Sequence, residues 1–127
     1  MSELLQATGT LANVGDIVQI GGPDPNPALA DSSTCTVELI GNIAKGGIAF
    51  EVSGGLPNAW YNAICWNKST PNALQTTATD AGLYVVPIAA CLGVRVRALP
   101  GFQGTVQVGM VAAGGYPVAY PGATIGP

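Results

Sequence analysis

Two glutamates are the residues of this chain whose type and spacing come nearest to catalytic chemistry. Glu38 and Glu51 lie in consecutive stretches of alternating apolar and polar residues. If these stretches pair as adjacent strands, the two carboxylates face each other, and paired carboxylates are the groups that hydrolyse glycosidic bonds. The same alternation puts Arg95 and Arg97 on the solvent side of another strand, so cross-strand ion pairs among these four residues are the favoured interpretation.

Nucleophilic and thiolate chemistry has little support in the sequence. There is no histidine, which leaves out Ser-His-Asp and Cys-His nucleophilic sites and histidine-bearing zinc sites. Cys35, Cys65 and Cys91 lie far apart along the chain, without the spacing of metal ligands or of a disulfide framework. We interpret them as core thiols, because free cysteine is among the most buried residue types.

Oxygen ligands for a cation are concentrated in the first part of the chain. Asp16, Asp24 and Asp31 could offer oxygen atoms to calcium, but their spacing matches no calcium-binding loop. We interpret them as solvated turn residues, since aspartate is common in turns. The sequence therefore predicts no metal, no cofactor and no catalytic residue, and a protein that is not an enzyme.

Trp60, Tyr61 and Trp66 form the main aromatic cluster of the sequence. Rings exposed together on one surface would suit stacking against a sugar, with Trp60 and Tyr61 as the platform. A β domain of this length also needs large core residues, so burial of at least one tryptophan is the favoured interpretation.

Charged residues are scarce in this chain. They make up 9% of its 127 residues, whereas an ordinary soluble domain has about 25%. The four basic residues are scattered and the net charge is −3, which argues against a nucleic-acid partner. The longest apolar run, 81–94, is interrupted by Pro87 and is shorter than the roughly 20 residues of a membrane-spanning helix, so we expect no membrane partner. Residues 1–10 lack a secretory signal pattern, and an odd number of cysteines fits assembly in a reducing cytoplasm.

Alternation of apolar and polar residues predicts β-strands along most of the chain, most clearly at 92–98 and 105–110. The predicted strands are 16–20, 35–40, 48–52, 60–66, 74–79, 83–87, 92–98 and 105–112. Short strands separated by turns at this spacing predict an all-β fold, an antiparallel two-sheet β-sandwich of jelly-roll or immunoglobulin-like type with little helix. Pro87 indicates an edge strand or a bend between sheets.

The strands 35–40 and 48–52 are predicted to pair as a hairpin. Their apolar residues would then share one layer, while Glu38 and Glu51 face outward. The glycines between 41 and 47 would supply the turn, because glycine adopts positive φ at little cost.

The chain divides into three predicted regions. Residues 1–33 form an extended N-terminal arm with one short strand and a proline-rich connector, whose prolines at 23–27 cannot lie inside a sheet. Residues 34–113 form the β-sandwich domain. Residues 114–127 form a Gly/Pro-rich C-terminal arm. A composition of this kind normally frays or stays extended, and a neighbouring subunit is the simplest agent that could hold it in place.

An ordered set of short motifs resembles a known class of proteins. In chain order the motifs are Gly41, Gly47-Ile-Ala-Phe-Glu-Val-Ser, Trp60, Thr76-Thr-Ala-Thr, Gly82-Leu-Tyr-Val-Val-Pro-Ile, Val94-Arg-Val-Arg and Gly104-Thr-Val-Gln-Val. The set covers about residues 34–113 and looks like the small β-sandwich structural proteins of tailed bacteriophage virions. These include capsid decoration or cement proteins and the sandwich modules of tail and fibre proteins. The sequence departs from the usual pattern at Pro57 and Asn58, which stand in place of an Asp-Gly turn.

The resemblance implies a virion structural protein without catalytic residues. Its most specific form is a capsid decoration or cement protein, assembled in the host cytoplasm, that stabilises the head by binding the capsid surface between major capsid subunits. The implied partners are the major capsid protein and further copies of the chain, as a homotrimer or another small homo-oligomer, and low charge suits such broad neutral contacts. The candidate assembly residues are Tyr116, Pro117, Tyr120 and Pro121, because tyrosine buries area while losing little rotamer freedom. The alternative is a tail or fibre sandwich module that binds host-surface carbohydrate through Trp60 and Tyr61.

Overall fold

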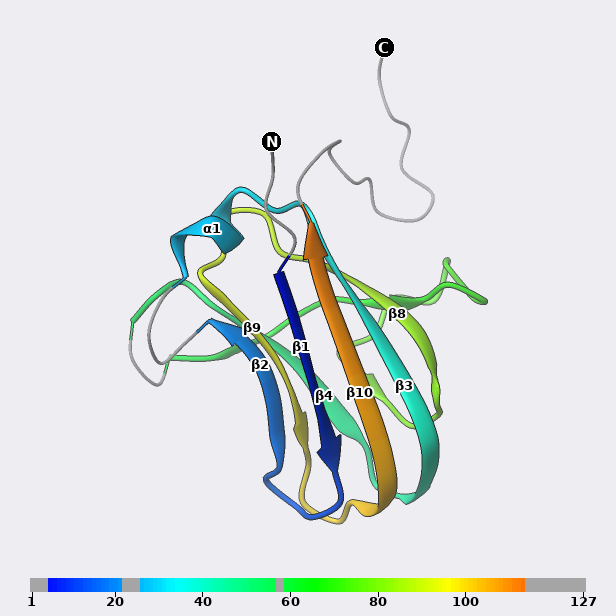
Figure 1. The fold of residues 1–127 in the computed structure, drawn as a ribbon. Helices are drawn as coiled ribbons and strands as arrows, with labels where there is room; N and C mark the ends of the chain where they lie inside the picture. The colour runs from blue at the N-terminus through cyan, green and yellow to red at the C-terminus, as the bar shows by residue number, and fades with distance from the viewer. Residues whose placement is uncertain (1–4, 22–25, 57–58, 114–127) are drawn as a thin grey trace.

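The computed structural model describes residues 5–21, 26–56 and 59–113, which form two antiparallel sheets facing each other across one core (Figure 1). Sheet A has the order β1 (Leu5–Leu11), β10 (Gln103–Ala113), β3 (Thr34–Lys45), β8 (Gly82–Pro87) and β6 (Trp66–Asn67). Sheet B has the order β2 (Ile17–Gly21), β9 (Gly93–Ala98), β4 (Ile48–Ser53) and β5 (Tyr61–Asn62), and β7 (Thr77–Ala78) also pairs with β4. The predicted all-β sandwich is confirmed.

Strand pairing is nested from the ends of the chain toward its middle. β1 pairs with β10, β2 with β9, β3 with β8 and β4 with β7. Apart from β4 and β5, which are both in sheet B, successive strands alternate between the two sheets, so the chain resembles one long hairpin rolled around the core. This is the jelly-roll form of the sandwich, one of the two types that the sequence predicts.

The core is built from the inward residues of both sheets. Val37 and Leu39 of β3 lie opposite Phe50 of β4 in one buried cluster, with no more than 2% of any of these residues exposed. The rings of Phe50 and Tyr84 pack with their centroids 5.2 Å apart, and the Tyr84 hydroxyl donates a hydrogen bond of 2.8 Å to the Asp80 carbonyl. A buried tyrosine thus keeps a partner for its hydroxyl.

Strands β1 and β2 of the N-terminal region are part of the sandwich, which corrects the predicted arm over residues 1–33. β1 pairs with β10 along its whole length, from Leu5 opposite Ala112 to Leu11 opposite Val106. β2 covers the predicted strand 16–20 and pairs with β9. Leu11 is fully buried, so these strands complete the core and do not reach away from it. The predicted C-terminal arm, 114–127, lies outside the described residues.

The predicted hairpin between 35–40 and 48–52 is wrong, because β3 and β4 belong to opposite sheets. Gly41 is not in a turn: it continues β3, and a Cβ there would lie 2.3 Å from the Thr105 carbonyl oxygen of β10. The chain crosses between the sheets after β3, at Gly46, whose φ is +76°. The shared apolar layer exists, but its two halves face each other across the core.

The predicted strand 60–66 is divided between the sheets, as β5 in sheet B and β6 in sheet A. Pro87 is the last residue of β8 and pairs with Thr34, whereas β6 pairs with β8 only at Val85 and Tyr84. Pro87 therefore lies where β8 has one neighbour, as the sequence predicts for an edge position. Helix is limited to the four residues of α1 (Pro27–Ala30), and no helix in the described part of the chain is long and apolar enough to cross a membrane.

Candidate functional site

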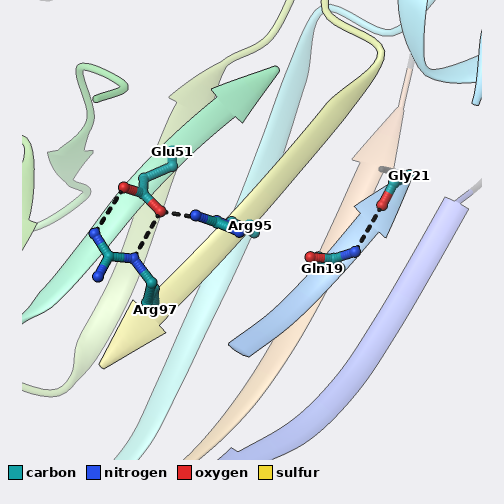
Figure 2. A network of polar contacts seen from close by, with 5 residues as sticks. All are labelled: Gln19, Gly21, Glu51, Arg95 and Arg97. Atoms are coloured by element: carbon teal, nitrogen blue, oxygen red, sulfur yellow. Dashed lines mark hydrogen bonds and ion pairs between the residues drawn. The ribbon is translucent and has the colours of Figure 1, made fainter. Parts of the chain in front are cut away.

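The outer face of sheet B carries a charged network formed by Glu51, Arg95 and Arg97 (Figure 2). Glu51 of β4 lies directly opposite Arg95 of β9. The Nε of Arg95 donates to Glu51 Oε1 at 2.8 Å, and Arg97 donates from Nε to Oε1 and from Nη2 to Oε2, both at 3.0 Å. Arg97 is thus a bidentate partner of the carboxylate, which is the strongest geometry for such a pair.

Electrostatics keep this carboxylate ionised. The hydrogen bond from Arg97 lowers the pKa of Glu51, and Arg95 acts in the same direction against the opposing effect of burial. The same pair raises the pKa of Arg97. The predicted ion pairs of Glu51 with both arginines exist. The sequence predicts that the carboxylate faces solvent, whereas the Glu51 side chain is only 7% exposed. A carboxylate whose pKa is lowered and whose oxygens are engaged by two arginines is unsuited to donate a proton in glycoside hydrolysis near neutral pH.

The two glutamates do not face each other. Glu38 lies in β3 of sheet A, where its neighbours in register are Gly109 and Leu83, whereas Glu51 lies in sheet B. Both ion pairs within the described residues involve Glu51, so Glu38 has no basic partner there. The predicted ion pairing is therefore correct for Glu51 and wrong for Glu38, and the candidate carboxylate pair is not assembled.

The aromatic residues point in different directions. The ring of Trp60 packs on the outer face of sheet B, with the Arg95 guanidinium carbon 4.2 Å from its centroid. Tyr61 lies opposite Val52 in the strand pair, and Val52 packs against the core, so Tyr61 is on the inner side of sheet B. Because it lies at the edge of the sheet, Tyr61 is nevertheless 64% exposed. Trp66 is buried, as expected for at least one tryptophan. Trp60 and Tyr61 therefore lie on opposite sides of sheet B and do not form one stacking platform.

The three cysteines are free thiols. Cys35 and Cys65 are fully buried, and burial raises the pKa of each to about 12. Cys91 is partly buried, and burial also raises its pKa. All three stay protonated near neutral pH, which is the inert form expected of core thiols and not the form that binds metals.

Asp16 stabilises the local backbone with its carboxylate. Asp16 accepts hydrogen bonds from the backbone N–H groups of Ala12 and Asn13, at 2.9 and 2.8 Å, and these bonds lower its pKa. Asp31 is the C-cap of α1, while Asp24 lies outside the described residues. No group of three or more histidine, cysteine, aspartate or glutamate side chains is placed to hold a metal ion in the part of the chain that the structure describes.

The outer face of sheet A is almost free of charge. The inward residues of its strands are in the core, so the alternate positions point outward. On β1 and β8, on β10 from Thr105 and on β3 as far as Ile40, these outward residues are Gln6, Thr8, Thr10, Thr105, Gln107, Gly109, Val111, Thr36, Glu38, Ile40, Leu83 and Val85. Glu38 is the only charged residue among them, and the exposed Lys45 lies beyond them at the far end of β3. Several apolar side chains are exposed here, and Ile40 is the most exposed, at 55%.

This neutral face contains a hollow of about 400 Å³. Its lining residues form a regular grid, in which one row is Thr8, Gly109 and Glu38 and the next row is Thr10, Gln107 and Ile40. Gly109 is in the centre of the first row and has no side chain, so the floor is backbone. The sequence does not predict this hollow, although the alternation of 105–110 puts Gly109 on the outward side of its strand.

The candidate assembly residues Tyr116, Pro117, Tyr120 and Pro121 lie outside the described residues. They follow β10, whose last residue is Ala113. Their role stays a prediction.

Comparison with known proteins concerns the fold. No family model and no curated protein matches this sequence. A solved prophage structure shares its fold. It is the crystal structure of SPBc2 prophage-derived protein YomS, which superposes with a TM-score of 0.63 at 14% sequence identity. The likeness covers 89% of this chain and 96% of YomS, so nearly the whole of each chain has the same architecture.

Proposed function

We propose that this chain is a bacteriophage virion structural protein, and most specifically a capsid decoration or cement protein that binds between major capsid subunits as a small homo-oligomer. The observation that carries the proposal is the fold shared with a prophage-derived protein over almost the full length of both chains. The jelly roll also occurs in capsid proteins and in lectins, so the fold by itself does not decide the function.

The surface of the sandwich supports an assembly role. The outer face of sheet A is broad and nearly uncharged, and its exposed apolar side chains can bury area against a neighbouring subunit. The charged residues of sheet B, one carboxylate and two guanidinium groups, are paired with one another within a single network. A tail or fibre module that binds carbohydrate is the alternative, but the separation of Trp60 and Tyr61 removes its expected platform.

Immunogold labelling of purified virions against this chain tests the proposal. We expect gold particles over the faces or vertices of the head, and particles from a phage lacking the gene should rupture at lower temperature or lower osmotic stress. Label at the tail tip would favour the fibre alternative. Virions without label would overturn both.

A further inference from the structure

The hollow on sheet A combines a lone negative charge with an uncharged, partly apolar rim. Thr8 and Glu38 are two strands apart, and the strand between them contributes only Gly109. Adjacent strands are about 4.8 Å apart, so the walls stand roughly 10 Å from each other. A gap of this width can accommodate one long side chain lying over the backbone of Gly109.

Glu38 has no basic partner among the residues that the structure describes. Neither ion pair within the described residues includes it, and the other described residues that line the hollow carry no charge. When a neighbouring surface covers this face, the carboxylate loses its water. Burial of a single charge is costly unless an opposite charge and hydrogen bonds accompany it.

We propose that the hollow receives a lysine or arginine side chain from a neighbouring protein subunit. The methylene stem would lie over Gly109 and against Ile40, and the cationic head would pair with the Glu38 carboxylate. Gln107, Thr8 and Thr10 offer oxygen atoms to the remaining N–H groups of the head. A long basic side chain is suited to this shape, because it buries its stem and keeps its charge near a polar partner.

Two other occupants fit less well. A sugar is disfavoured because none of the described residues that line the hollow is aromatic, and aromatic faces are the surfaces on which sugars stack. A second copy of this chain is disfavoured because each copy has a net charge of −3, whereas a partner with excess basic charge is attracted. The proposed occupant therefore belongs to a different protein.

Two variants separate the charge from the shape. Glu38→Gln removes the charge at constant size. Gly109→Leu fills the hollow, and it should not disturb the fold because a Cβ at Gly109 meets no atom within 4 Å. Gly54→Leu is the matched control, since a Cβ at Gly54 also meets no atom within 4 Å and this residue follows β4 of the other sheet. The melting temperature of each variant verifies that it folds.

The inference rests on the proposed function, so binding to phage heads that lack this chain is the first measurement. We expect Glu38→Gln and Gly109→Leu each to weaken binding by at least about tenfold, and Gly54→Leu to bind as the wild type does. Binding of the wild type should weaken with added salt, and this dependence should be smaller for Glu38→Gln. Equal binding by all four proteins would overturn the docking site and leave the proposed function standing. Failure of the wild type to bind would overturn the proposed function.

A second measurement tests the hollow without any particle. Titration of the ¹⁵N-labelled full chain with n-butylammonium and with ethylguanidinium should shift the amide signals of Gly9 and Gly109 in a saturable way. The shifts should vanish in Glu38→Gln, and n-butanol should not reproduce them. The proposal is overturned by shifts that persist in Glu38→Gln, by the same shifts on addition of galactose or N-acetylglucosamine, or by self-association that Glu38→Gln abolishes.

Discussion

At the scale of single residues, the chain uses its few charges for structure. Glu51 engages two arginines at once, and Trp60 covers one of them. The network places one carboxylate between two guanidinium groups, so removal of Glu51 leaves two partly buried positive charges without a counter-charge. The loss of one member of such a group is more damaging than the loss of an exposed pair.

Glu51→Gln should lower the free energy of unfolding at pH 7 by about 3 kcal/mol, because both arginines lose their anionic partner. The lowered pKa of Glu51 also predicts a pH dependence. Its stabilising contribution is present above the ordinary carboxyl value of 4.5 and is lost as the pH falls through the lower value of the folded state. Urea unfolding at several pH values should therefore show a smaller loss on acidification in Glu51→Gln than in the wild type.

Asp16 should preserve part of the acid sensitivity in that variant, since its pKa is also lowered. Glu38→Gln is the matched control, because Glu38 forms no ion pair within the described residues. Equal stability of Glu51→Gln and Glu38→Gln at pH 7 would contradict a structural role for the network.

Ala90 is the only non-glycine residue with positive φ in the described part of the chain, at 65°. It occupies the third position of the turn in which the Cys91 N–H donates to the Ile88 carbonyl at 2.9 Å. Glycine is favoured at this position of a type II turn. Ala90→Gly should raise the free energy of unfolding by up to about 1 kcal/mol.

Ala89→Gly provides the control for that turn. Ala89 precedes Ala90, is also exposed and has no positive φ, so glycine there only adds freedom to the unfolded chain. It should lower the stability by about 0.5–1 kcal/mol. Thermal unfolding of both variants measures the difference, and changes of the same sign would contradict the assigned turn.

At the scale of elements, close contact between the sheets decides which small residues are required. β1 and β2 belong to different sheets, yet a Cβ at Gly9 of β1 would lie 2.7 Å from Cγ2 of Val18 in β2. Valine cannot move this methyl group easily, because its χ1 is restricted. Gly9 thus permits the two edge strands to close one side of the sandwich.

Gly9→Ala should therefore destabilise the protein by about 1–3 kcal/mol through overpacking. Gly109→Ala is a matched substitution on the neighbouring strand, where the new Cβ meets no atom within 4 Å, and it should be neutral or slightly stabilising. A double-mutant cycle of Gly9→Ala with Val18→Ala should show a favourable coupling. Additive effects in the chemical denaturation curves would refute the contact.

Strand positions could be predicted from the sequence where the alternation is strong. β8, β9 and β10 match the predicted ranges closely, because large apolar residues recur on every second position. β1 was missed since its inward positions include Ala7 and Gly9, which are small and give a weak pattern. The sequence predicts the jelly roll as one of two sandwich types. The strand pairs that distinguish the two types join residues far apart in the chain, such as β1 with β10.

Strand alternation does not reveal which sheet a strand joins. β3 and β4 show the same period whether they pair as a hairpin or face each other across the core, so the position of Glu38 relative to Glu51 could not be predicted. The ion pairs of Glu51 were predicted because opposite charges fell on outward positions of two strands. The hollow depends on the register that brings Thr8, Gly109 and Glu38 into one row, and no local pattern specifies that register.

At the scale of the whole molecule, the two outer faces differ in character. Sheet B carries a closed charge network, and sheet A presents a nearly neutral surface with one carboxylate. A protein with such unequal faces can present one side to a neighbouring subunit and the other to solvent. This asymmetry suits the proposed role on a virion.

Truncation after Ala113 tests whether the C-terminal residues Tyr116 and Tyr120 anchor the chain to the capsid. The truncated chain keeps all of β10 and should retain the wild-type melting temperature. Its binding to phage heads should fall by at least about tenfold, as expected when large anchoring side chains are removed. A double substitution of both tyrosines by alanine should reproduce the loss. Undiminished binding would remove these residues from the interface.

The nested pairing also determines the order in which the fold can be completed on the ribosome. β1 is synthesised early, but its partner β10 emerges only after most of the chain, roughly 5–20 seconds later at ordinary translation rates. During this interval the edge of β1 that pairs with β10 in the finished fold has no hydrogen-bonding partner. Neighbouring nascent chains on one messenger RNA could pair through it, so slow translation or crowded polysomes should favour strand-exchanged dimers.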